Sequence, residues 1–213
     1  DYMARHDGMS PHNLAFRRRG LNTEFVGDTR LFSCKYPSDA YDGWLGTTNP
    51  VMPAEILKPW LEKAKKDPDV GAYACHEFEP PKPGHQYLIT ADPAGFGSTG
   101  DKSALTVWDA TDWKEIAFWE DRESPDRFAH RLQVVQKRYL GALLAVESNA
   151  TACIAILKDQ ETRNLLWTDR NHPGWYATNK RLQESEARLV QMLRQEDLSI
   201  RSRGMLHQLL NYD

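Results

Sequence analysis

The chain has 213 residues, 40% of them hydrophobic, which is enough for one sizeable core of ordinary composition. A formal net charge of −3 excludes general attraction to nucleic acid, so nucleic-acid binding would depend on local basic patches. The sequence contains no run of about 18 apolar residues and no signal peptide, so we expect a cytoplasmic protein without membrane contact. The distant Cys34, Cys75 and Cys153 predict reduced thiols.

The first 84 residues differ from the rest of the chain, because proline and glycine interrupt each helical or strand pattern after a few residues. One helix is predicted over 53–66, where Ile56, Leu57 and Trp60 keep a helical spacing. The stiff sequence EPPKPG at 79–84 marks a boundary. We therefore predict an N-terminal connecting segment over 1–84 and a core domain over 85–213.

The core domain begins with an apolar run over 87–91 that predicts a strand ending in the lone acid Asp92. Pro93 and a glycine-rich turn follow, and a β pattern resumes over 104–108. These residues predict a strand, a loose turn and a second strand that returns alongside the first.

The turn resembles a phosphate-binding loop, but the match fails on two counts. Asp101 separates Gly100 from Lys102 and breaks the required G-x-x-x-x-G-K-[ST] spacing. A phosphate loop must also lead into a helix, whereas Ala104 begins a predicted strand. We therefore expect no nucleotide binding at this turn.

Strands and helices then alternate along the chain. A third strand is predicted over 115–120, a helix from Ser124-Pro125-Asp126, and an apolar, buried parallel strand over 142–146. Two further helices are predicted over 151–158 and 179–196. This order predicts an α/β fold with a mixed central sheet flanked by helices.

A second lone acid, Glu147, follows the strand over 142–146 just as Asp92 follows the first strand. If these strands are parallel neighbours at the sheet centre, the two carboxylates lie side by side and repel unless they share a divalent cation such as Mg²⁺ or Mn²⁺. The alternative is that Asp92 caps its own turn and Glu147 caps the next helix near Thr151.

Several motifs in series carry a family resemblance: ITADPAGFGSTGDKSALTVWD, AVESNA, GWYATNKRLQESEARLVQML and SIRSRGMLHQLLNYD. Together they resemble the nuclease domain of a tailed-bacteriophage terminase large subunit, which has the ribonuclease H-like fold. The resemblance covers about residues 85–213. Residues 1–84, with HNLAFRRRGLNTEF, resemble the junction to the upstream packaging ATPase of that family.

The resemblance implies roles for three acids. Asp92 and Glu147 would be the first and second metal-binding acids of a site that holds two Mg²⁺ or Mn²⁺ ions, and Asp101 an auxiliary acid. The implied reaction is hydrolysis of double-stranded viral DNA concatemers during genome packaging, in the cytoplasm of the infected bacterial host. The implied partners are duplex DNA, the packaging ATPase domain, the portal and the small terminase subunit.

Basic residues in the C-terminal part are the candidates for holding the DNA backbone. They are Lys180, Arg181, Arg188, Arg201 and Arg203. The alternative for each is ordinary surface charge on a solvated helix.

The chain also departs from the family pattern. The third catalytic aspartate of the family lies downstream of the helix that 207–212 begins, and the chain ends at Asp213, so we expect an incomplete metal site and weak activity. No Walker motif is present. Two alternatives remain: another ribonuclease H-like nuclease, of transposase or resolvase type, and a non-catalytic docking module that keeps the fold.

Overall fold

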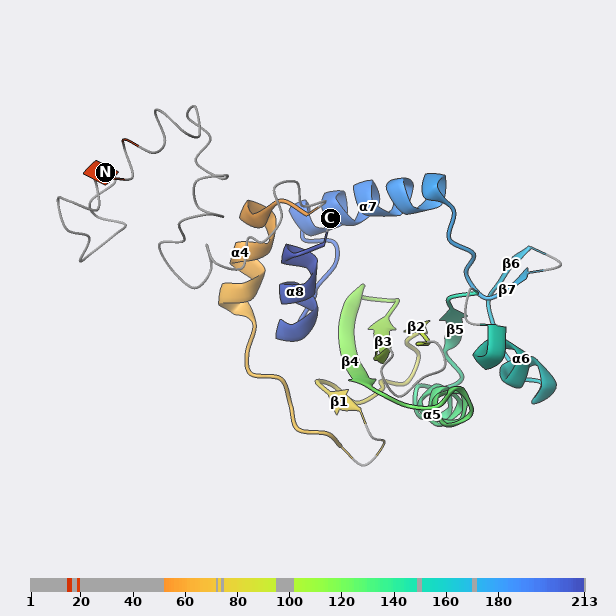
Figure 1. Ribbon diagram of the computed structural model, residues 1–213. Helices are drawn as coiled ribbons and strands as arrows, with labels where there is room; N and C mark the ends of the chain where they lie inside the picture. Colours follow the sequence, from red (N-terminus) through yellow and green to blue (C-terminus); the bar gives the residue numbers. More distant parts are fainter. Residues whose placement is uncertain are drawn as a thin grey trace. The chain divides into compact units, whose positions relative to one another are not determined.

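The computed structural model of the protein describes residues 15, 16, 19, 52–71, 73, 75–94, 102–148, 151–169 and 172–212 (Figure 1). The chain divides into two compact units, one of residues 1–57 with 207–213 and the other of residues 58–206. The second unit contains the sheet and both candidate acids.

The described elements follow one another in an α/β order. They are α4 (Ala54–Lys63), β1 (His76–Glu77), β2 (Tyr87–Asp92), β3 (Ser103–Asp109), β4 (Lys114–Asp121), α5 (Pro125–Arg138), β5 (Leu143–Val146), α6 (Thr151–Asp159), β6 (Trp167–Asp169), β7 (His172–Pro173), α7 (Asn179–Arg194) and α8 (Arg203–Leu210). The last helix begins at Arg203, four residues earlier than the sequence predicted. Among the described helices, none is long and apolar enough to cross a membrane.

Five strands form one mixed sheet in the order β1-β4-β3-β2-β5. Strands β2 and β5 are parallel, and the other pairs are antiparallel. The predicted α/β fold with a mixed central sheet flanked by helices is therefore confirmed. The sheet also includes β1, which precedes the predicted boundary at residue 84 and pairs with β4.

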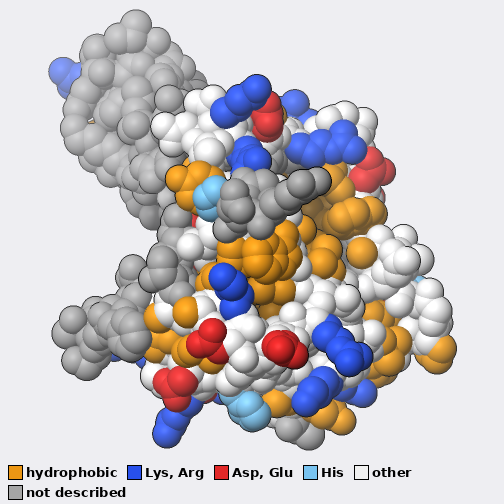
Figure 2. Space-filling view, turned by 90° about the vertical axis from the view of Figure 1, so that its right-hand side faces the viewer, with side chains coloured by type: hydrophobic (Ala, Val, Ile, Leu, Met, Phe, Trp, Pro, Cys, Tyr) orange, Lys and Arg blue, Asp and Glu red, His pale blue; other side chains and the backbone are white. Residues whose placement is uncertain are grey.

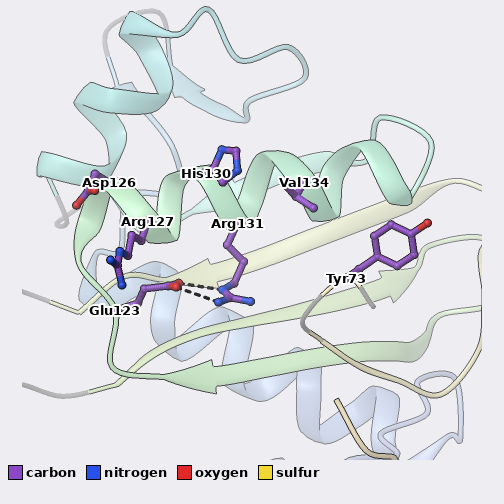
Figure 3. A pocket seen from close by; sticks show the side chains of 7 residues that line it. All are labelled: Tyr73, Glu123, Asp126, Arg127, His130, Arg131 and Val134. Carbon is purple, nitrogen blue, oxygen red and sulfur yellow. Dashed lines mark hydrogen bonds and ion pairs between the residues drawn. The ribbon is translucent and has the colours of Figure 1, made fainter. Parts of the chain in front are cut away.

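Helices α5 and α6 bury their apolar faces against the sheet. Phe128, Leu132 and Val135 follow a helical spacing on α5 and are fully buried in one core cluster. The same cluster contains Ile89 from β2 and Leu144 from β5, and α5 lies alongside the strands in Figure 3. This core fixes the ends of β2 and β5 in space.

Strand β5 differs from its prediction as a fully buried central strand. It is the last strand of the sheet, and its residues alternate between exposed and buried positions, with Leu143 42% exposed and Leu144 fully buried. Among the described residues, isolated bridges join Leu144 to Leu165 and Glu147, the residue after β5, to Trp175. An all-apolar sequence does not show that one face of a strand, here that of Leu143, is exposed to solvent.

A buried carboxylate joins the C-terminal part of the larger unit to the sheet. Glu115 on β4 is fully buried, and one of its oxygens accepts the backbone N–H groups of Arg201 and Ser202 at 2.7 and 2.8 Å. Burial raises the pKa of Glu115 to about 7, and the nearby Asp67 contributes, whereas the two N–H groups and the Arg201 charge act in the opposite direction.

This carboxylate predicts a pH dependence of stability. Because its pKa is higher in the folded state, Glu115 stabilises the fold fully below about pH 4.5 and loses that contribution as the pH rises through about 7. We expect the free energy of unfolding, measured with urea, to fall more steeply over this range in wild type than in Glu115→Gln. Glu79 does not contribute in this window, because ion pairs hold its pKa at about 2. Parallel curves for the two proteins would contradict the assignment.

Candidate metal centre at the carboxyl edge of the sheet

The two candidate acids lie at the carboxyl ends of the adjacent parallel strands β2 and β5. We call this end of the sheet, where Asp92 and Glu147 lie, the carboxyl edge. Asp92 is the last residue of β2, and Glu147 directly follows β5. The residues before them, Ala91 and Val146, are register partners, and the N–H of Glu147 donates to the Ala91 carbonyl at 2.9 Å. Neighbouring strands are about 4.8 Å apart, so the two backbone positions are close enough for both carboxylates to reach one ion. The predicted pairing of these strands is confirmed.

The two acids differ in exposure: Asp92 is exposed and Glu147 is half-buried. Asp92 lies on the sheet face where Thr90 is also exposed, opposite the face that α5 and α6 cover. Solvation alone can therefore stabilise the Asp92 carboxylate, and the case for a metal depends on the juxtaposition of two acids, not on burial.

Backbone contacts hold Glu147 from both sides. On one side is β2, and on the other the segment 174–175, where Trp175 donates to the Val146 carbonyl at 2.7 Å and accepts from Ser148 at 3.0 Å. Gly174 permits this approach: its φ is +84°, and an added Cβ would lie 2.4 Å from the Val146 carbonyl oxygen. No local pattern indicates that Trp175 would flank Glu147, because the contact spans 28 positions.

A hydrogen bond joins the residues just after β2 to the first residue of β3. The N–H of Ala94 donates to Ser103 Oγ at 2.9 Å, and Ser103 is buried. The strand predicted after Lys102 is confirmed as β3. The predicted auxiliary acid Asp101 lies outside the described residues, so its role stays a prediction.

A second group of metal-ligand side chains, which the sequence analysis missed, lies at the opposite edge of the sheet. Among the described residues, only His85, Asp109 and Asp112 place three such atoms within 4.8 Å of one another. His85 precedes β2 and Asp109 ends β3, so about 20 Å of strand separates this cluster from Asp92. The D-A-T-D sequence over 109–112 was the available signal, since Asp often accepts hydrogen bonds from the following turn.

The contacts within this cluster are those of a closed turn. His85 Nδ1 is 2.8 Å from Asp109 Oδ2, and Asp109 Oδ1 accepts the N–H groups of Thr111 and Asp112 at 3.1 and 3.4 Å. Lys114 Nζ lies 3.7 Å from Asp112 Oδ2 and would repel a cation bound there. Hydrogen bonds and an ion pair thus account for this cluster without a metal.

Three of the predicted DNA-binding residues are exposed on α7. Thr178 begins this helix by accepting the Arg181 N–H, and Lys180 lies 3.8 Å from Glu184. Arg181 and Arg188 line a hollow of about 500 Å³ together with Trp175, the residue that pairs with Glu147. Two of the predicted DNA-binding residues therefore share this hollow with Trp175, and the acidic Glu184 also lines it.

The other two predicted DNA-binding residues have structural contacts. Arg201 pairs with Glu79 at 2.7 Å and lies over the Phe78 ring at 4.9 Å. The backbone N–H of Arg203 donates to Asp67 at 3.1 Å, and its side chain is exposed. On the face in Figure 2, Lys and Arg side chains form several groups separated by hydrophobic and uncharged surface. DNA contacts would therefore be distributed and not concentrated in one patch.

A hollow of about 530 Å³ beside α5 has a mixed character (Figure 3). Glu123 and Arg131 point toward each other there and form two hydrogen bonds of 2.9 Å, and Arg131 stacks on Trp119 at 4.1 Å. These opposite charges compensate each other, so the hollow gives no basis for an anion or cation site.

The strand order and the parallel β2–β5 pair define an α/β fold with a mixed central sheet. The solved structures with a similar fold include the large terminase nuclease of thermophilic phage G20c, at 16% identity over 73% of this chain and 80% of that chain, with a TM-score of 0.55.

The same G20c nuclease with bound magnesium is similar over 78% of this chain and 81% of that chain, with a TM-score of 0.56 and 16% identity. The large terminase nuclease domain of Thermus phage P74-26 has a TM-score of 0.54 and 16% identity, over 73% of this chain and 77% of that chain. At this identity the likeness shows the fold. No protein-family model and no curated protein matches the sequence.

Proposed function

We propose that the chain is a metal-dependent endonuclease that cleaves double-stranded viral DNA concatemers during genome packaging, as part of a phage large terminase. The observation that carries this proposal is the pair of carboxylates, Asp92 and Glu147, at the ends of adjacent parallel strands. The similarity to solved terminase nucleases supports the choice among ribonuclease H-like enzymes.

The donor set fits hard divalent cations. Carboxylate oxygens are the ligands that Mg²⁺ and Mn²⁺ prefer, and the exposure of Asp92 leaves room for the water ligands that Mg²⁺ retains. When two ions are bound, such a site supplies an activated water and stabilises the leaving 3′-oxygen. Asp92 and Glu147 would hold the ions, with Asp101 as an auxiliary acid, and the backbone contacts of Glu147 would keep its carboxylate in place.

The basic residues would position the DNA. Arg181 and Arg188 are exposed beside Trp175 and can hold phosphates near the carboxyl edge. Phosphate contacts carry no direct sequence information, so cleavage would show little sequence preference of its own. The partners we propose are duplex DNA, the packaging ATPase domain, the portal and the small terminase subunit, in the cytoplasm of the infected host.

The test is conversion of supercoiled plasmid with and without divalent ions. We expect nicking in Mn²⁺, slower nicking in Mg²⁺ because Mg²⁺ demands near-ideal octahedral geometry, and none in EDTA. Cleavage that persists in EDTA would contradict a metal-dependent reaction. Duplex binding with no cleavage in either metal would favour the docking module.

A further inference from the structure

We propose that Lys102 is a phosphate-binding residue of the carboxyl edge and that Glu120 holds and restrains it when DNA is absent. This inference rests on the proposed nuclease function and names a residue that contacts the DNA strand beside the metal-binding acids. Two observations support it: the register of β2, β3 and β4, and the ion pair between Lys102 and Glu120.

The strand register places these residues on one face of the sheet. Asp92 is directly opposite Ala104, and Ala104 is directly opposite Glu120. Directly opposite residues in antiparallel strands project to the same face. Lys102 lies two positions before Ala104, and its Nζ reaches Glu120 Oε1 at 3.0 Å, which fits the same face. Asp92 and Glu120 are therefore about 10 Å apart at their Cα atoms.

The backbone that carries Lys102 is anchored. The next residue, Ser103, is 1% exposed and accepts the Ala94 N–H, two residues after Asp92. The backbone of Lys102 is therefore held close to Asp92, and its side chain can reach the carboxyl edge.

Electrostatics supports a phosphate as the ligand. The edge carries two acids, and bound ions offset their charge only at the phosphate being cleaved. A neighbouring phosphate of the same strand needs its own cation, and a flexible lysine serves as a point charge for it. The Lys102 and Glu120 side chains are 55% and 38% exposed, so solvent screens their ion pair and it opens readily. Glu120 would then repel the phosphate and limit binding until Lys102 is displaced.

The experiment measures the salt dependence of binding by fluorescence anisotropy, with a short DNA duplex in EDTA so that no cleavage occurs. We expect Lys102→Ala to weaken binding and to reduce the slope of log K against log salt by about 0.9, the value for one phosphate contact. Lys102→Arg should restore the slope, and Glu120→Gln should tighten binding severalfold.

Another exposed ion pair provides matched controls. Lys63 and Glu196 lie 3.3 Å apart with 61% and 66% exposure, so Lys63→Ala and Glu196→Gln make the same charge changes outside the sheet. We expect wild-type slopes for both. An unchanged slope in Lys102→Ala, or equal effects in the control pair, would overturn this inference while leaving the nuclease proposal intact. Absence of DNA binding by wild type would instead overturn the nuclease proposal itself.

Discussion

Replacement of either acid at the carboxyl edge is expected to lower the rate of metal-dependent plasmid cleavage at least about 100-fold, which corresponds to about 2.7 kcal/mol of transition-state stabilisation. Asp92→Asn and Glu147→Gln keep the shape of each side chain and remove the charge that holds the cation. Because these acids repel phosphate, duplex binding in EDTA should remain or tighten slightly.

A matched control lies at the opposite edge of the sheet. Asp112→Asn removes one carboxylate of equal charge from the cluster of His85, Asp109 and Asp112, and its side chain is 47% exposed. We expect this variant to cleave plasmid at the wild-type rate. A rate loss in Asp112→Asn with normal rates in Asp92→Asn and Glu147→Gln would move the metal centre to the other edge.

Gly174→Ala is expected to be the most destabilising small substitution near the site. Its positive φ costs an alanine about 1–2 kcal/mol, and overpacking against the Val146 carbonyl and Ile154 Cδ1, at 2.4 and 2.9 Å, adds about 1–3 kcal/mol. The segment 174–175 must therefore move away from β5 or the fold must loosen. Thermal unfolding followed by circular dichroism measures the cost.

A second glycine, Gly84, allows the cost of a positive φ to be measured apart from the cost of steric overlap. Gly84 has a φ of +82°, nearly that of Gly174, but no atom of the described residues lies within 4 Å of an added Cβ. In Gly84→Ala the free energy of unfolding should fall only by the cost of the positive φ, about 1–2 kcal/mol. This variant should cleave plasmid at the wild-type rate. Gly174→Ala should also slow cleavage, because Trp175 would no longer hold Glu147. Equal losses of stability in the two variants would show that the close approach to Val146 is unimportant.

The sequence predicted the elements that carry strong periodic patterns. Helix α5 has a proline at its first turn and apolar residues at helical spacing, and its start was predicted. Strand β2 was predicted because a β-rich run ends at Pro93. The parallel pairing of β2 with β5 followed from the order of strands and helices, and with it the juxtaposition of Asp92 and Glu147.

The features that the sequence did not predict depend on contacts between distant positions or on which face of the sheet is exposed to solvent. Strands β1 and β7 have two residues each and β6 three, too few for any periodicity. The exposure of Asp92 and Leu143 depends on what lies over one face of the sheet, which no local pattern states. The pairing of Lys102 with Glu120 was not predicted because Lys102 precedes β3 and Glu120 lies on β4, 18 positions later.

The most direct test of the central claim is a crystal soaked in Mn²⁺ and measured at a wavelength where manganese scatters anomalously. A metal shared by the two acids predicts an anomalous peak at the carboxyl edge, with oxygens of Asp92 and Glu147 both at about 2.0–2.6 Å from the ion. The peak should vanish in Asp92→Asn crystals. A peak confined to His85, Asp109 and Asp112, or no peak near Asp92 and Glu147 at saturating Mn²⁺, would contradict the assignment of these two acids as the metal centre.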